Sequence, residues 1–121
     1  MAVTYDVFPR ETSFQLSRQE EGGGTTEIAV VPQPAGYPRL ETVTVTETLT
    51  NGYYAFEIFD AWGDGICCTF GNGEYALSAD GIVLTRGKEF RFTEFVCLEV
   101  RNGTVTVLGT RDRQIDCRSI S

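Results

Sequence analysis

Apolar and polar residues alternate with a period of two in several short segments of this chain, and no other periodicity is as frequent. The alternation recurs in four segments, which cover residues 3–7, 42–46, 54–58 and 90–93. Successive side chains of a β-strand point to opposite faces, so each segment predicts a strand with one buried and one solvated face. A chain built mainly from such segments is constrained to fold as β-sheets.

Three pairs of an acidic or amide residue followed by glycine separate the alternating segments. They are Asn51-Gly52, Asp80-Gly81 and Asn102-Gly103, and each favours a type I′ hairpin because both central residues take positive φ. The pattern contains about nine short strands and no helix, which excludes a parallel sheet with its crossover helices. We therefore predict an all-β fold, an antiparallel β-sandwich of jelly-roll-like kind, as a single domain over residues 1–121.

Composition excludes several classes of function. The 121 residues include no histidine, which removes Ser-His-Asp and Cys-His nucleophile pairs and histidine-ligated zinc. The formal net charge of −7 opposes binding to a phosphate backbone, so no nucleic-acid partner is expected. No apolar run approaches the roughly 18 residues of a membrane span, and the first residues do not resemble a signal peptide.

One segment departs from the strand pattern and concentrates unusual residues. Residues 60–73 contain four glycines, two aspartates, two adjacent cysteines and the only tryptophan of the chain. Binding residues are often carried on loops that a rigid scaffold positions. We therefore expect the functional site at this loop.

The loop also carries a resemblance to a known family. The pattern Asp60-x-x-Gly-Asp-Gly-Ile-Cys-Cys-x-x-Gly-x-Gly-x-Tyr75, the aromatic strand before it and the segment Asp6 to Phe14 resemble a secreted β-module. That module recurs, often in tandem, in cell-surface proteins of marine algae and is appended to secreted zinc metalloproteases. The resemblance covers residues 3–96 and implies a secreted, extracellular protein.

The chain departs from this family in two places. Tyr53 stands where the module usually has a cysteine, and the segment from Cys97 to Ser121 lies outside the family pattern. We therefore expect a family-like core over residues 3–96 and a C-terminal hairpin and tail over residues 97–121.

The aspartates of the loop suggest a calcium site. Calcium takes six to eight oxygen ligands, commonly from carboxylates and loop carbonyls, and Asp60 and Asp64 lie in one glycine-rich loop. Asp6 and Glu11 complete the predicted ligand set if the first strand runs beside this loop. The alternative is an ordinary turn in which the aspartates bond the local backbone.

The four cysteines predict disulfides in an extracellular protein, with three possible pairings. Cys67 and Cys68 point to opposite sides if extended, so we expect them to bond to two different partners, Cys97 and Cys117. That arrangement ties the C-terminal tail to the loop. A four-cysteine zinc site is a weaker alternative, because zinc knuckles favour cysteines two to four residues apart.

The aromatic residues around the loop are candidate ligand contacts. Trp62, Phe70 and Tyr75 could stack on the apolar faces of sugar rings. The alternative for Phe70 and Tyr75 is that they close one end of the sandwich core.

Together these features predict a non-catalytic, calcium-stabilised binding or adhesion module that recognises extracellular polysaccharide or matrix. The alternative is a self-assembling structural subunit of an extracellular coat or filament, since threonine-rich strands such as residues 42–50 carry few charges to protect an edge. A third reading, an enzyme with Glu57 and Asp60 as an acid–base pair, has no recognisable spacing to support it.

Overall fold

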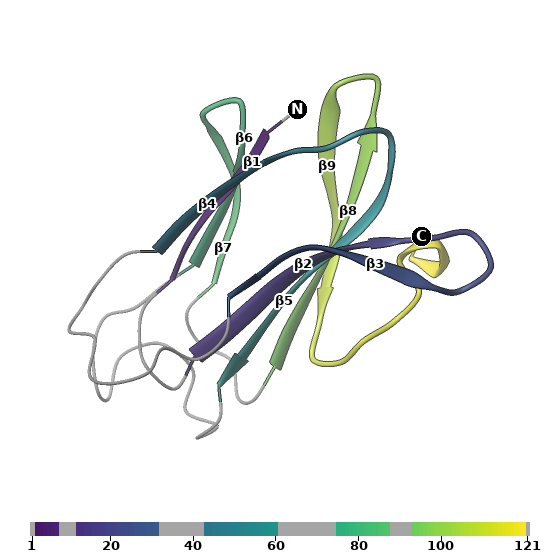
Figure 1. Ribbon diagram of the computed structural model, residues 1–121, viewed down its shortest axis with the longest axis horizontal. Coiled ribbons are helices and arrows are strands. Elements are labelled where there is room, and N and C mark those ends of the chain that lie inside the picture. The colour runs from purple at the N-terminus through teal and green to yellow at the C-terminus, as the bar shows by residue number, and fades with distance from the viewer. Residues whose placement is uncertain (1, 8–11, 32–42, 61–74, 88–92, 121) are drawn as a thin grey trace.

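The computed structural model describes residues 2–7, 12–31, 43–60, 75–87 and 93–120, and they form an antiparallel β-sandwich (Figure 1). The described strands are β1 (Ala2–Val7), β2 (Thr12–Gln19), β3 (Thr25–Val31), β4 (Val43–Thr48), β5 (Gly52–Asp60), β6 (Tyr75–Ala79), β7 (Ile82–Gly87), β8 (Thr93–Arg101) and β9 (Thr104–Arg111). They are followed by one turn of 3₁₀ helix, η1 (Cys117–Ser119). The predicted fold class and strand number are confirmed.

The strands form two sheets with different orders. One sheet has four strands in the order β4-β1-β6-β7, and the other has five in the order β3-β2-β5-β8-β9. Only the pairs β2–β3, β6–β7 and β8–β9 are hairpins; each of the other connections carries the chain from one sheet to the other. Such crossed connections are typical of jelly-roll and Greek-key sandwiches.

Two of the three predicted hairpin turns are confirmed. Asp80 and Asn102 have φ values of 51° and 50°, and the glycines that follow them also have positive φ values. A type I′ turn requires positive φ at both central residues. The prediction of a hairpin at Asn51-Gly52 is wrong, because β4 and β5 belong to different sheets. The side chain of Asn51 instead accepts a hydrogen bond from the backbone N–H of Asn102 at 2.9 Å, which joins two turns at one end of the sandwich.

The core lies between the two sheets. Alternate residues of the central strands point into it, and they include Leu16 from β2, Phe56 from β5, Leu77 from β6 and Leu98 from β8, all fully buried. The rings of Phe56 and Tyr75 lie 5.1 Å apart and join the two sheets. The alternating segment 54–58 therefore supplies Tyr54, Phe56 and Ile58 to the interior, as the period of two predicts, and leucines of β2, β6 and β8 supply much of the rest.

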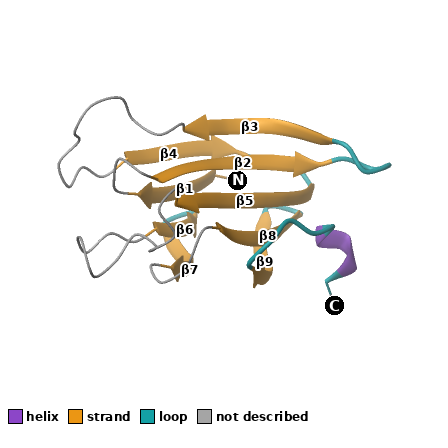
Figure 2. Cartoon of the chain, turned by 90° about the horizontal axis from the view of Figure 1, so that it is seen from below, coloured by secondary structure: helices purple, strands orange, loops and turns teal. Residues whose placement is uncertain are grey.

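A second, smaller cluster lies on the opposite face of the five-stranded sheet. It consists of Ala55, Phe95, Cys97 and Cys117, with Ile115 and Ile120 packed against it. The tail after β9 crosses this face and ends in η1 (Figures 1 and 2). The stretch beyond residue 96 thus completes the sheet and covers its outer face.

A half-buried carboxyl group, that of Glu94, lies beside the core residue Tyr75. Glu94 of β8 accepts a hydrogen bond from the hydroxyl of Tyr75, and burial raises the pKa of the Glu94 carboxyl above its usual range. Its buried Oε2 accepts no hydrogen bond from any described residue. Gly87 leaves room for the Tyr75 ring, since a Cβ at that position would lie 2.4 Å from it.

The raised pKa of Glu94 predicts the sign of a pH effect on stability. A carboxyl whose folded pKa lies above its unfolded pKa stabilises the fold at low pH, and that contribution is lost as pH rises through the folded pKa. Glu94→Gln is neutral throughout and keeps a carbonyl for Tyr75, so its stability relative to wild type should rise from pH 4 to pH 8. Urea unfolding at both pH values measures this difference, with Glu47→Gln on β4 as the control. A difference that does not change with pH would contradict the assignment.

Candidate functional site

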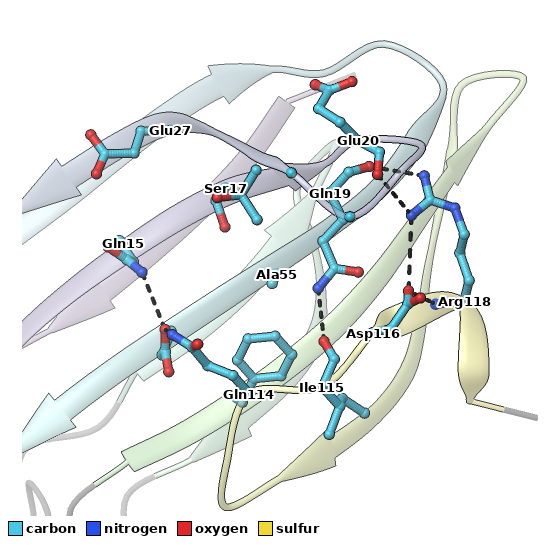
Figure 3. A pocket seen from close by; sticks show the side chains of 15 residues that line it. Gln15, Ser17, Gln19, Glu20, Glu27, Ala55, Gln114, Ile115, Asp116 and Arg118 are labelled. Carbon is cyan, nitrogen blue, oxygen red and sulfur yellow. Dashed lines mark hydrogen bonds and ion pairs between the residues drawn. The ribbon is translucent and has the colours of Figure 1, made fainter.

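The described part of the chain contains a polar groove on the outer face of the five-stranded sheet, shown in Figure 3. The groove has a volume of about 420 Å³, within the usual range for small-molecule sites. Its floor comes from β2, β5 and β8, one wall from the β2–β3 hairpin, and the other wall from the C-terminal tail. The lining residues used below are Gln15, Ser17, Glu57, Gln114, Asp116 and Arg118.

The floor of the groove is set by strand register. Gln15 of β2 lies opposite Glu57 of β5, and Glu57 lies opposite Phe95 of β8. Paired residues of neighbouring strands point to the same face of a sheet, so these three side chains share the outer face. The hydrophobic neighbours of Glu57 along β5, Phe56 and Ile58, point the other way into the core.

Glu57 is the central group of the groove. It is only 3% exposed, and its Oε1 accepts hydrogen bonds from the side-chain amides of Gln15 at 3.1 Å and Gln114 at 2.9 Å. These are its only hydrogen bonds within the described ranges, and no described cation pairs with it. Two neutral amide donors therefore hold a buried carboxylate in a fixed orientation.

The tail wall is attached to the sheet by a disulfide. Cys97 of β8 bonds to Cys117 of η1, with the two Cα atoms 5.4 Å apart, and both residues are fully buried. Cys97 lies opposite Ala55 in the register of β8 with β5. The small side chain of Ala55 leaves space on the outer face for the bond and for Cys117.

Hydrogen bonds from Gln19 continue this attachment. Its amide donates to the carbonyl of Ile115 at 2.8 Å and accepts from the N–H of Cys117 at 2.7 Å. Figure 3 shows the Gln19 side chain reaching the tail between the groove and Arg118. One side chain thus satisfies two backbone groups that would otherwise be left without partners beside a buried disulfide.

Arg118 closes the end of the tail against β2. Its guanidinium donates to the carbonyls of Gln19 at 3.0 Å and Glu20 at 3.4 Å. It also lies 4.9 Å from the centre of the Tyr53 ring, a cation–π contact. Asp116 caps η1 by accepting from the N–H of Arg118, so local capping aligns this arginine with its partners.

The Cys97–Cys117 bond corrects the predicted disulfides. Cys97 and Cys117 are disulfide-bonded as expected, but to each other, so neither is the partner of Cys67 or Cys68. The prediction failed because it assumed that the tail returns to the 60–73 loop. The tail instead folds over the outer face of its own sheet, where the β8 register places Cys97 beneath it.

The structure also places some of the predicted loop-site residues. Tyr75 is 1% exposed in the core, so it has no free face for a ligand and fills the alternative role of closing the core. Asp6 is the last residue but one of β1 and Asp60 is the last residue of β5, and these two strands terminate at the same end of the sandwich (Figures 1 and 2). Glu11, Trp62, Asp64, Cys67, Cys68 and Phe70 lie outside the described residues. No cluster of three or more metal-ligating side chains occurs in the described ranges.

Sequence reasoning did not find the groove. Glu57 stands in a strand whose outer face was expected to be wet, and Gln15 and Gln114 are ordinary polar residues in their own segments. The available signal was a charged residue in an otherwise apolar run, Tyr54 to Ile58, together with a cysteine on the neighbouring strand.

Comparisons of this chain with protein-family models, with curated proteins and with solved structures found no match. The resemblance to the secreted β-module therefore stays a prediction. Within the described residues no helix is long and apolar enough to cross a membrane.

The disulfide should carry much of the stability of the tail wall. Replacing both Cys97 and Cys117 by alanine removes a cross-link between residues 20 positions apart, which the chain-entropy relation values at about 3 kcal/mol. Urea unfolding should show that loss. Arg118→Ala, which removes only exposed tail contacts, should cost about 1 kcal/mol. A double variant as stable as wild type would show that the tail is held by other contacts.

Proposed function

We propose that this protein is a non-catalytic extracellular binding module that recognises polysaccharide through the groove on the five-stranded sheet. The observation that carries the proposal is the fixed set of polar groups around Glu57, where one amide from the floor (Gln15) and one from the tail wall (Gln114) meet the carboxylate. Sugar hydroxyls both donate and accept hydrogen bonds, and amides and carboxylates complement them. The buried disulfide favours an oxidising, extracellular setting.

The rigidity of the groove supports a binding role. Its floor lies on paired strands, and its tail wall is held by a disulfide, by Gln19 and by Arg118. A preformed site loses less conformational entropy when a ligand binds. The absence of histidine from the sequence favours binding over acid–base catalysis at this site.

The predicted calcium site is proposed as a separate, stabilising element at the end of the sandwich where β1 and β5 terminate. It rests on the position of Asp60 at the end of β5, on that of Asp6 one residue before the end of β1, and on the sequence of the 60–73 loop. The groove does not depend on it, because none of its lining residues belongs to that end.

A self-assembling structural subunit is the second candidate function. Strand β7 is an edge of the four-stranded sheet, and its residues Ile82 and Val83 are 67% and 44% exposed. An exposed edge strand with large apolar side chains is suited to pairing with another chain. This candidate places the contact surface on the sheet opposite to the groove.

Depletion of the protein from solution by a panel of insoluble neutral, amino and sulfated polysaccharides tests the main proposal. Gln114→Ala removes one exposed groove amide and should weaken binding about fivefold, the effect of one lost hydrogen bond. It also removes one of the two donors to Glu57, so a fall of a few degrees in the melting temperature is expected, about the effect of 1 kcal/mol. Thr106→Ala on β9 is the control and should bind like wild type. If no polysaccharide removes the protein from solution and the apparent mass from light scattering grows with protein concentration, the proposal is wrong and self-assembly is the better account.

Calcium should raise the melting temperature in proportion to the logarithm of its concentration if only the folded protein binds it. Magnesium should do less, because it gives up its water reluctantly. Asp60→Asn should reduce the response. Identical melting curves in EDTA and in millimolar calcium would favour an ordinary turn at this loop.

A further inference from the structure

The buried carboxylate of Glu57 lacks the partner that buried charges usually have. A carboxylate removed from water is normally paired with a cation or saturated with hydrogen bonds. Glu57 is 3% exposed, and the described chain supplies it with only two amide donors, both at Oε1. Oε2 accepts no hydrogen bond from the described residues, and it is not one of the fully enclosed atoms without a partner, so it is open to the groove.

The groove around Glu57 is negatively charged. Four carboxylates line it, those of Glu20, Glu27, Glu57 and Asp116, against a single guanidinium, that of Arg118. Glu20 is paired with Arg18 at 3.4 Å and Asp116 with Arg118 at 3.9 Å, whereas Glu27 and Glu57 have no ion pair among the described residues. That guanidinium is already occupied by the carbonyls of Gln19 and Glu20 and by the Tyr53 ring. The groove therefore repels sulfated and uronic-acid polymers and attracts a cation.

Among the described residues, the hydrogen-bond acceptors that remain free around Glu57 favour an ammonium group over a guanidinium group. The Gln15 and Gln114 amides donate their N–H groups to Oε1 of Glu57, which leaves their carbonyl oxygens and Oε2 of Glu57 as three acceptors from three residues. An ammonium group has three N–H donors around one charge. A guanidinium is a planar fork that prefers both oxygens of a carboxylate, and Oε1 already accepts two bonds.

We propose that the groove selects polysaccharides that carry a free, protonated amino group, with the ammonium held at Oε2 of Glu57. The inference rests on the proposed function and deepens it by naming the substrate class, a 2-amino-2-deoxy sugar unit without its acetyl group. In the described part of the chain, the hydroxyl of Ser17 and the second N–H of each glutamine amide remain free to form hydrogen bonds with neighbouring hydroxyl groups of the sugar. N-acetylation removes both the charge and two of the three donors, so it should abolish the preference.

Binding of three short oligosaccharides of equal length, measured by calorimetry at mildly acidic pH, tests this selection. The oligosaccharides are a β-1,4-linked glucosamine oligomer, its fully N-acetylated form and a β-1,4-glucan oligomer. One charge-assisted hydrogen bond corresponds to a difference of about tenfold or more in dissociation constant. The glucosamine oligomer should therefore bind at least about tenfold more tightly than the other two oligosaccharides. Glu57→Gln keeps an acceptor for both glutamines and should remove that preference. Glu47→Gln, on β4 of the opposite sheet, should keep it.

The outcomes separate this inference from the proposed function. If all three oligosaccharides bind equally, and Glu57→Gln binds them as wild type does, the selection of amino sugars is overturned. The proposed polysaccharide site would remain. Binding of a short polylysine peptide that depends on Glu57, with no oligosaccharide bound, would overturn both in favour of a peptide site. If urea unfolding shows that Glu57→Gln does not fold, Gln114→Ala is used in its place. Loss of its carbonyl acceptor should weaken binding of the glucosamine oligomer more than binding of the neutral oligomers, and equal weakening would overturn the amine selection.

Discussion

Strand β5 is buried on both faces, and the rest of the structure depends on this. Five consecutive residues, Tyr54 to Ile58, are each at most 3% exposed, although only alternate ones face the core between the sheets. The outer face stays dry because the tail after β9 is bonded over it through Cys97 and Cys117. Without that cover, Ala55 and Phe95 would be exposed and Glu57 would be an ordinary solvated residue.

The same cover creates the groove. The tail lies over one part of the outer face and the β2–β3 hairpin borders another, so the space between them is walled on both sides (Figure 3). Gln114 belongs to the tail yet completes the hydrogen bonding of a carboxylate on the central strand. Fold stability and the proposed recognition therefore share one set of contacts, in which the disulfide positions the groups that a sugar would meet.

The local features of this fold could be predicted from the sequence, and the long-range ones could not. Alternation located β1, β4 and β5, and Asp80-Gly81 and Asn102-Gly103 formed the expected turns, because both signals act over a few residues. The predicted strand over residues 90–93 lies, except for Thr93, outside the described residues. Asn51-Gly52 gave no hairpin, because the choice of sheet for β4 and β5 depends on partners far away in the chain. The pairing of Cys97 with Cys117 and the burial of Glu57 depend on where the tail returns, which no local pattern encodes.

Peptide mapping under non-reducing conditions tests most directly whether the tail is bonded to its own sheet. Complete tryptic cleavage places Cys97 in peptide 92–101, Cys117 in peptide 114–118, and both Cys67 and Cys68 in peptide 40–86. Our account predicts that mass spectrometry finds peptides 92–101 and 114–118 joined by a disulfide that separates on reduction. Finding either of them joined to peptide 40–86 instead would contradict it, because the tail would then be tied to the 60–73 loop and the outer face of β5 would lose its cover.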